Sequence, residues 1–311
     1  MGDRRRAFAH NSDHHLRRSR SDRRTAARPR GPDLTGGVTM DQHRLPLTKL
    51  QTGLPPASPS AVLRVIADIS SVGGRFELGV SRAEAGWRPL TDLLTDPGGL
   101  EAVIRDMAGH MGTDETRVAA SILFQKVASR LCSPAFGAAV AHGLLIDLDP
   151  RHVHWHAAPD GVLPLRVTDP AGWEVRDPVQ AADALYRTVV IGLLEPLGEA
   201  VRAVVKIAPG LLWGNAASAL AGTMRALVRV RPELTGPALT LGRELLDIGP
   251  LRDTGELAEP SPGHPFFVRR SCCLYYRVSG DKCGDCGLTD PGAPRDRRAH
   301  AVHGSRRARP A

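Results

Sequence analysis

Four of the five cysteines lie close together near the C-terminal end of the chain. Cys272, Cys273, Cys283 and Cys286 form the pattern C-C-x9-C-x2-C. Thiols this close in sequence can surround one centre at a small cost in loop-closure entropy. The rest of the fold must therefore present this segment, and the first question is whether it holds disulfides, a zinc ion or an iron–sulfur cluster.

The spacing of these cysteines discriminates among the three centres. Disulfides fit poorly, because the total of five cysteines is odd and the N-terminal region lacks the apolar stretch of a secretory signal. Zinc prefers two C-x2-4-C pairs, and only Cys283 and Cys286 form one. The side chains of Cys272 and Cys273 diverge in an extended chain, so one small ion would require a strained turn. A two-iron cluster takes two thiolates on each iron, so the spacing favours a [2Fe-2S] cluster.

Residues 267–277, followed by Cys283-Gly284-Asp285-Cys286, resemble the C-terminal motif of the FhuF-type ferric-siderophore reductases. The double cysteine distinguishes that family from ordinary ferredoxins, and ten residues usually follow it where this chain has nine. The segment Trp213-Gly214-Asn215 is similar to one in FhuF-like proteins and in the related region of siderophore synthetases. The resemblance implies a [2Fe-2S] protein that reduces the Fe(III) of a siderophore, with no catalytic residue beyond the cluster and its four cysteine ligands.

The partners implied by this chemistry are a ferric siderophore and an external electron donor such as a ferredoxin or a flavin reductase. No dinucleotide, haem-attachment or flavin motif supplies a second redox group within the chain. Positive side chains near the cysteines can attract an anionic siderophore or an acidic donor. The candidate substrate-binding residues are Arg269, Arg270, Arg277, Lys282, Trp213 and Asn215.

Two other interpretations of the cysteine segment remain open at this point. The first is a zinc-stabilised or iron–sulfur-sensing interaction protein without reductase activity. The second is a fold similar to the siderophore synthetases that has lost its chemistry. Tyr275 and Tyr276 are expected either to shield the cluster from water or to pack the segment against the body of the protein.

The strong positive charge belongs to the two ends of the chain. Residues 1–39 carry a net charge of +6 and residues 295–311 a net charge of +5, against +8 for the whole chain, so the middle is slightly acidic. Arginine-rich ends without periodic apolar residues predict disorder, and we expect no nucleic-acid partner. A second interpretation is that translation starts at Met40, which would make residues 1–39 an upstream extension without a structural role.

The expected organisation has four parts. These are a disordered arginine-rich extension (1–45), a helical FhuF-like body (46–260), a [2Fe-2S]-binding segment (261–290) and a disordered basic tail (291–311). The sequence contains no run of eighteen or more apolar residues, so we expect no membrane span and at most transient contact with membranes. Cysteine usage and the absence of a signal peptide predict a location in the reducing cytoplasm.

The hydrophobic pattern predicts a mainly α-helical protein with a small β-hairpin or sheet, an α+β fold. Helices are expected from Ser58 to the Gly73-Gly74 turn, over 87–94, 97–109, from Thr113 to about 131, 135–142, from 178, from Pro209, and over 235–248. A short strand is expected over 75–80, a hairpin over 151–157 and 162–167, and a loop over 249–265.

Two groups of residues outside the cysteine segment draw attention. His152, His154 and His156 alternate along the predicted strand and therefore share one face. Such a face suits a metal, a substrate pocket or simple solvation, and the sequence does not choose among them. Cys132 follows the apolar stripe of its helix and is expected to be a small core residue.

Overall fold

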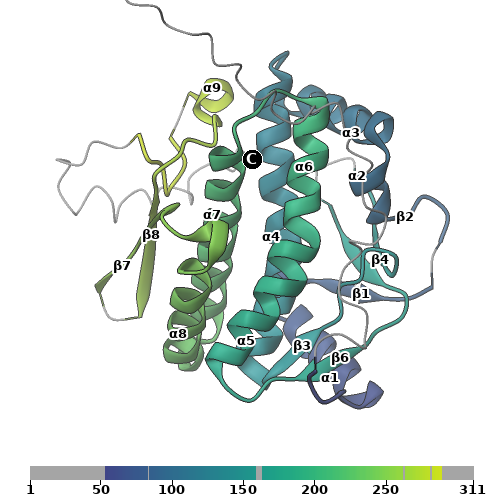
Figure 1. Cartoon of the computed structure of the whole chain (residues 1–311), viewed down its shortest axis with the longest axis vertical. Coiled ribbons are helices and arrows are strands. Elements are labelled where there is room, and N and C mark those ends of the chain that lie inside the picture. The colour runs from purple at the N-terminus through teal and green to yellow at the C-terminus, as the bar shows by residue number, and fades with distance from the viewer. Residues whose placement is uncertain (1–52, 83, 159–162, 262, 281, 289–311) are drawn as a thin grey trace, which may run out of the picture. The chain divides into compact units, whose positions relative to one another are not determined.

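The computed structural model describes residues 53–82, 84–158, 163–261, 263–280 and 282–288 (Figure 1). The expected N-terminal extension and C-terminal tail lie outside the described residues. Helices dominate the described chain and three small sheets accompany them, so the prediction of a mainly helical α+β fold is confirmed.

The elements follow one another in the order shown by the colours of Figure 1. The helices are α1 (Pro59–Ser70), η1 (Gly74–Phe76), α2 (Thr91–Thr95), α3 (Pro97–Met111), α4 (Thr116–His142), α5 (Pro178–Leu185), η2 (Tyr186–Leu194), α6 (Glu195–Val204), α7 (Pro209–Val230), η3 (Pro232–Leu234), α8 (Thr235–Leu246), η4 (Gly249–Leu251) and α9 (Tyr276–Ser279). The strands are β1 (Leu78–Val80), β2 (Arg88–Pro89), β3 (Leu144–Ile146), β4 (Val153–Trp155), β5 (Leu165–Val167), β6 (Gly172–Glu174), β7 (Gly255–Ser261) and β8 (His264–Arg269).

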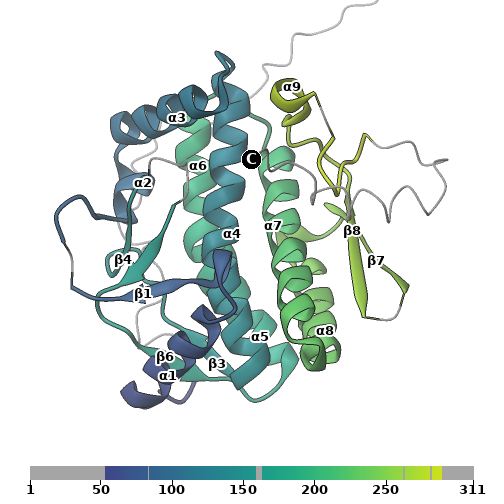
Figure 2. The same ribbon diagram turned by 180° about the vertical axis from the view of Figure 1, so that it is seen from behind.

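Helix α4 is the central element of the core, and α7 packs along it (Figures 1 and 2). The 27 residues of α4 are buried on nearly all sides of the helix, so its apolar residues do not follow the periodicity of a helix with one buried face. The sequence predicted two helices separated before Ala135. Instead, α4 continues through Pro134 and ends at Gly143, which adopts a left-handed conformation (φ 59°) suited to glycine.

The helix starts and the turns follow simple local rules. Ser58, Asp96 and Asp177 cap α1, α3 and α5 by accepting a hydrogen bond from a backbone N–H in the first turn. The Gly73-Gly74 turn is confirmed, since both glycines have a positive φ (81° and 60°). The structure limits the predicted 75–80 strand to β1, because Gly74–Phe76 forms a 3-10 turn.

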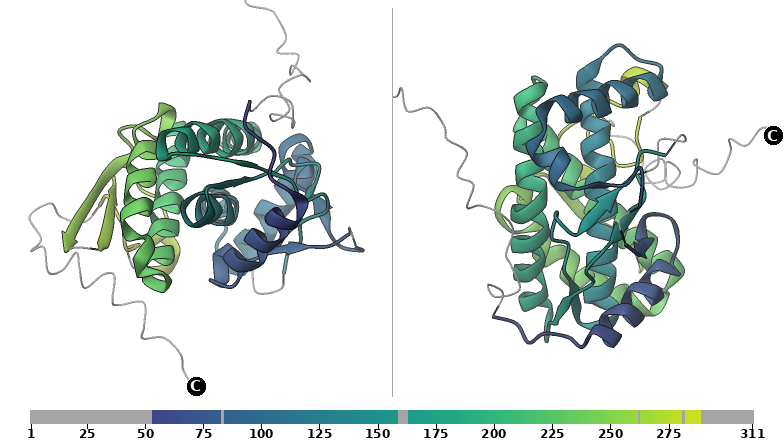
Figure 3. Two further views of the ribbon diagram at one scale, coloured as in Figure 1. Left: turned by 90° about the horizontal axis from the view of Figure 1, so that it is seen from below. Right: turned by 90° about the vertical axis from the view of Figure 1, so that its right-hand side faces the viewer.

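The sheets are small and lie beside the helices (Figure 3). One has the order β1-β5-β4-β2, and in it the predicted hairpin is confirmed as the antiparallel pair β4 and β5. Residues 88–89, expected in a helix, form β2 instead and pair with β4. The prediction of a loop over 249–265 is also wrong, because β7 and β8 form a hairpin that leads into the cysteine segment.

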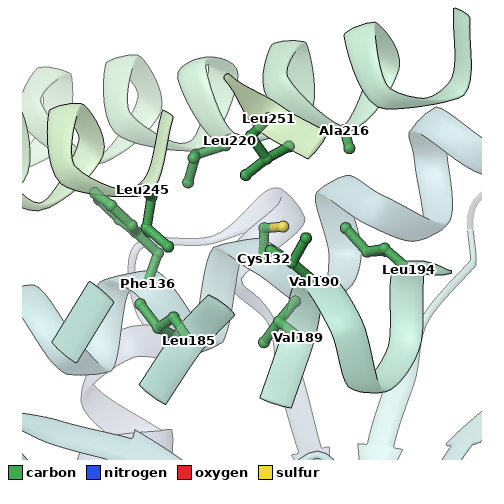
Figure 4. Close-up of a pocket in the computed structure, with 10 residues that line it drawn as sticks. All are labelled: Cys132, Phe136, Leu185, Val189, Val190, Leu194, Ala216, Leu220, Leu245 and Leu251. Atoms are coloured by element: carbon green, nitrogen blue, oxygen red, sulfur yellow. The ribbon is translucent and has the colours of Figure 1, made fainter. Parts of the chain in front are cut away.

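A π-helix, η2, interrupts the expected continuous helix after α5. It contributes to an apolar pocket lined by Cys132, Phe136, Leu185, Val189, Val190, Leu194, Ala216, Leu220, Leu245 and Leu251 (Figure 4). Burial raises the pKa of the Cys132 thiol to about 12. This cysteine therefore stays protonated as a core residue, as expected. Among the described helices, none is long and apolar enough to cross a membrane.

An ion-pair cluster joins α1 to the ends of α4 and α7. Arg231 donates to both carboxylate oxygens of Asp68 (2.6 and 2.9 Å), and His142 Nε2 lies 2.7 Å from Asp68 Oδ2. Hydrogen bonds from Arg231 and His142 lower the pKa of Asp68 from 3.8 to about 2. A lowered pKa stabilises the folded state above about pH 4, and this contribution is lost as the pH falls towards 2.

We therefore expect Asp68→Asn to lower the free energy of unfolding by about 1 kcal/mol at pH 7, since the carboxylate is 40% exposed and screened by solvent. The stability of the variant should also fall less steeply than that of the native protein between pH 4 and pH 2. Urea unfolding at a series of pH values measures both effects. Asp183→Asn, which removes an exposed i,i+4 pair with Arg187, is the control and should change little. Equal acid sensitivity of native and Asp68→Asn proteins would contradict this assignment.

Candidate iron–sulfur site

The hairpin β7–β8 carries the chain to the cysteines along α7 (Figure 1). Phe267 of β8 is buried against the core, and Gly255 on β7 leaves room for its ring, because a Cβ there would lie 2.3 Å from Phe267 Cζ. After the strand, Arg270 N–H donates to the Thr254 carbonyl. The start of the cysteine segment is therefore fixed to a rigid hairpin rather than to a loop.

A tight turn follows the double cysteine. Leu274 has a positive φ of 69°, which is uncommon for a residue with a side chain. Its N–H lies 3.3 Å from Cys272 Sγ and donates to that sulfur. The short helix α9 follows and ends at Gly280 (φ 73°), which turns the chain back towards Cys283. The chain therefore turns tightly just after the double cysteine, at Leu274.

The four cysteines lie at one end of α7, and two of them are in contact. Cys273 and Cys283 sulfurs are 3.5 Å apart, close to the roughly 3.8 Å expected for two thiolates bound tetrahedrally to one metal at about 2.3 Å each. The nine-residue spacing is therefore long enough to join this pair. Cys286 is buried, Cys272 is partly buried, and the charges of Cys273 and Cys286 both act on the Cys272 thiol. Among the described residues, no three His, Cys, Asp or Glu side chains converge as they would on a single ion.

The thiols of the close pair differ in acidity. A hydrogen bond with Cys283 lowers the pKa of Cys273 to about 6, and the charge of Arg269 contributes in the same direction. The same hydrogen bond, together with burial, raises the pKa of Cys283. The contact therefore favours one thiolate in the pair, and thiolate is the form that binds iron.

Arg269 lies at the centre of a buried polar network beneath the cysteines. Its side chain is fully buried and donates to Asn215 Oδ1 (2.6 Å) and to both carboxylate oxygens of Asp285 (3.0 and 3.1 Å). Ser218 of α7 hydrogen-bonds both Arg269 and Asp285. Burial would raise the pKa of Asp285, but the charge of Arg269 and the hydrogen bonds from Ser218 and Arg269 outweigh it, so this carboxyl is ionised.

The network also connects the segment to α4. Asn215 Nδ2 donates to the backbone carbonyl and the hydroxyl of Ser121, both at 2.9 Å. The Ser121 hydroxyl in turn donates to the Cys273 carbonyl (2.8 Å). Gln125, one turn further along α4, donates to Ser218 (3.0 Å). Both central helices therefore hold the backbone and the charged groups of the cysteine segment.

These residues fit a [2Fe-2S] cluster. Four thiols, of which Cys273 and Cys283 are in contact, match the number of thiolates that a [2Fe-2S] cluster takes. The Arg269 Nε–H is buried without a partner in the described residues, and the guanidinium charge acts on Cys273 and Cys283. A buried cation with a free donor beside the thiols suits an anionic group whose sulfurs accept hydrogen bonds.

Gly214 explains why the Trp213-Gly214-Asn215 segment needs a glycine. A Cβ at this position would lie 1.9 Å from the Ser271 hydroxyl and 3.2 Å from its Cβ, so Ser271 can approach α7 only because no side chain is there. We expect Gly214→Ala to weaken the docking of the cysteine segment by about 1–3 kcal/mol. Hydrogen exchange of the backbone amides in 264–280 and 282–288 should accelerate accordingly.

The controls for this prediction use the same helix. Gly210, also in α7, has open space at its Cβ position, so Gly210→Ala should leave exchange in the cysteine segment unchanged. Adding Ser271→Ala to Gly214→Ala should restore part of the protection, because it removes the atom that is approached most closely. Unchanged exchange in the Gly214→Ala protein would show that this contact does not hold the segment.

The predicted substrate residues occupy different environments. Arg269 and Asn215 are buried and bonded to protein groups, so the structure gives them a supporting role, and contact with substrate stays a prediction for them. Trp213 is partly buried against the core. The other three residues are exposed. Arg270 forms an ion pair with Asp253, and Arg277 forms one with Glu115. Lys282 donates to the Leu288 carbonyl.

Other predicted groups lie elsewhere or behave differently. Tyr275 and Tyr276 are 40% and 38% exposed, so neither packs fully into the protein. His152, His154 and His156 are all partly buried, and His156 lies against Trp87 with ring centroids 5.7 Å apart. They belong to the β4 region and do not join the cysteine segment.

Sequence reasoning missed several residues that support the site. Asp285 lies inside the C-x2-C pair, and Ser121, Gln125 and Ser218 come from helices far away in the sequence. Asp285 could have been found from its position between two cysteines, where a carboxylate is unfavourable unless a buried cation compensates it. The serines and Gln125 give no comparable signal in the sequence.

Comparison with known families agrees with this geometry. Residues 269–287 match the family described as the FhuF 2Fe-2S C-terminal domain. This match confirms the FhuF-type resemblance of the cysteine segment and identifies it as a [2Fe-2S]-binding domain. The match covers only this short segment of the chain, and it makes the protein an iron–sulfur protein. No curated protein matches the chain significantly.

Proposed function

We propose that this protein is a ferric-siderophore reductase that releases iron by one-electron reduction. The observation that carries the proposal is the cysteine segment, which matches a [2Fe-2S] domain of the FhuF type and contains a thiol pair at metal-sharing distance. A [2Fe-2S] cluster, when bound, supplies one electron at a time. The hard oxygen ligands of a siderophore hold Fe(II) far less tightly than Fe(III), so reduction is itself the release step.

The protein's own residues prepare the site for this reaction. The Arg269 charge, fixed by Asp285 and Asn215, stabilises thiolates at Cys273 and Cys283. The pairing also keeps Arg269 in place when no cluster is bound. An external donor, a ferredoxin or a flavin reductase, returns the electron. It is expected to dock at the exposed rim that contains Tyr275, Tyr276 and Arg277.

The experiment uses the full chain purified without oxygen. We expect about two irons and two sulfides per chain, with visible absorption that bleaches on reduction by dithionite. Adding a ferric siderophore should restore the absorption while a ferrous chelator traps about one Fe(II) for each reduced chain. A chain that contains iron and sulfide but is not reoxidised by any ferric siderophore would contradict the proposal.

The alternative is a zinc-stabilised or cluster-sensing interaction protein. Zinc alone, without sulfide, in the protein as purified would favour the zinc form of this alternative. A cluster that forms but never passes an electron to a ferric complex would favour the sensing form.

A further inference from the structure

A group of arginines lies beside the α4–α7 pair, outside the cysteine segment. Arg75 comes from η1, Arg130 from α4, and Arg225 and Arg229 from α7. Burial and the charges of the other three all lower the pKa of Arg75, so the four cations lie within reach of one another. Arg75 nevertheless keeps an exposed surface, and Arg130 and Arg225 are partly buried.

The contacts of Gly222 give the geometry of this group. A Cβ at Gly222 would lie 2.8 Å from Arg75 Nη1 and 4.0 Å from Arg225 Nη2. The two guanidinium groups therefore flank the same glycine of α7, which leaves the space that the Arg75 head occupies. Arg130 is fixed to η1 by donating to the carbonyls of Gly74 and Glu77.

Within the described residues, these cations form no ion pair with a carboxylate within 4 Å. Other arginines of the described chain do pair with an acid within 4 Å. Arg231 pairs with Asp68, and Arg277 pairs with Glu115. In the described ranges, the side chains of Arg75, Arg225 and Arg229 take part in no hydrogen bond or ion pair, and Arg130 Nε–H is buried without a partner. The charge of Glu77 acts on Arg130, but Glu77 Oε1 accepts from Gly74 N–H.

The arginine group lies next to the cysteine segment. Ser218, Gly222, Arg225 and Arg229 follow one another at intervals of three or four residues, so they share one face of α7. Ser218 contacts Asp285 between the last two cysteines, and Arg225 is about 10 Å further along the helix axis. The charge of Arg225 also acts on Asp285.

We propose that Arg75, Arg130 and Arg225 form the docking site for a negatively charged Fe(III) chelate, whose oxygen ligands are catecholates or carboxylates. This inference rests on the proposed function and assigns its substrate class. A guanidinium group can bind such oxygens with two parallel hydrogen bonds, and neighbouring cations without an ion-pair partner gain most from an anion. The partial burial of Arg130 and Arg225 suits a small ligand more than the broad surface of an acidic donor protein.

Binding is tested without electron transfer by using gallium(III), which cannot be reduced as iron(III) can. The probes are the negatively charged tris-catecholate complex of gallium(III) and the neutral tris-hydroxamate complex, titrated into the full cluster-loaded chain. We expect Arg75→Gln and Arg225→Gln each to weaken tris-catecholate binding about tenfold, the loss of one charge-assisted hydrogen bond. Added salt should weaken native binding as well, and the neutral complex should be insensitive to both variants.

Arg202→Gln is the matched control, because Arg202 is exposed on α6 and its loss changes the net charge equally. Native-like tris-catecholate affinity in Arg75→Gln and Arg225→Gln, or no binding by the native chain, would overturn the site. If both variants bind the gallium complex normally but accept electrons slowly from the donor, the arginines belong to the donor interface and the proposal is wrong. Arginine-dependent binding without any iron reduction would support the docking site and contradict only the proposed reductase activity.

Discussion

Replacing Cys283 by alanine is expected to reduce the bound iron from about two atoms per chain to nearly none, and ferric-siderophore reduction to the background rate. Cys283 forms the close pair with Cys273, so its loss would remove one of the four thiolates that would hold the cluster. The three remaining cysteines would hold iron and sulfide less firmly. Iron and sulfide analysis, visible absorption and trapping of Fe(II) measure the three consequences together.

The control for this variant is Cys132→Ala. Cys132 is buried in the apolar pocket of Figure 4, away from the cysteine segment, and its thiol stays protonated. Removing its sulfur should cost about 1 kcal/mol of stability and leave iron content and reduction rate unchanged. If Cys283→Ala keeps two irons and reduces substrate at the native rate, the cluster assignment and the mechanism are both wrong.

The cysteine segment could be predicted from the sequence because its pattern is local. A double cysteine restricts the possible centres by spacing alone, whereas the tight turn at Leu274, with its positive φ, was not predicted. The supporting network could not be predicted, since Ser121 and Asn215 are 94 positions apart and meet only through the packing of α4 on α7. Periodic patterns place residues on a helix face but do not say which faces meet.

The charged residues near the cysteines show the same limit of prediction from sequence. Arg269 and Arg270 are neighbours with the same side chain, and both were predicted from the sequence to bind substrate. Arg269 ends β8 with its side chain directed into the α7 interface, whereas Arg270 points to solvent and pairs with Asp253. The alternation of a strand produces this difference, and the strand itself was missed because residues 249–265 contain several prolines and glycines.

The largest effect on stability is expected from Arg269→Met. The substitution keeps an unbranched apolar side chain of similar reach but leaves the ionised Asp285 buried without its cation. Breaking a buried pair in this way typically costs about 3–5 kcal/mol. The loss should appear in urea unfolding of the metal-free protein, because bound iron would add its own stabilisation and obscure the difference.

Arg270→Met is the matched control at the next position, where both partners are largely exposed, and it should cost at most about 1 kcal/mol. The double variant Arg269→Met, Asp285→Asn should recover part of the loss, because the second change removes the unpaired charge and keeps a side chain that Ser218 can hydrogen-bond. Recovery separates the electrostatic cost from a simple loss of packing, which Asp285→Asn could not repair. If Arg269→Met is no less stable than Arg270→Met, the buried network does not hold the cysteine segment, and the hairpin β7–β8 must fix it alone.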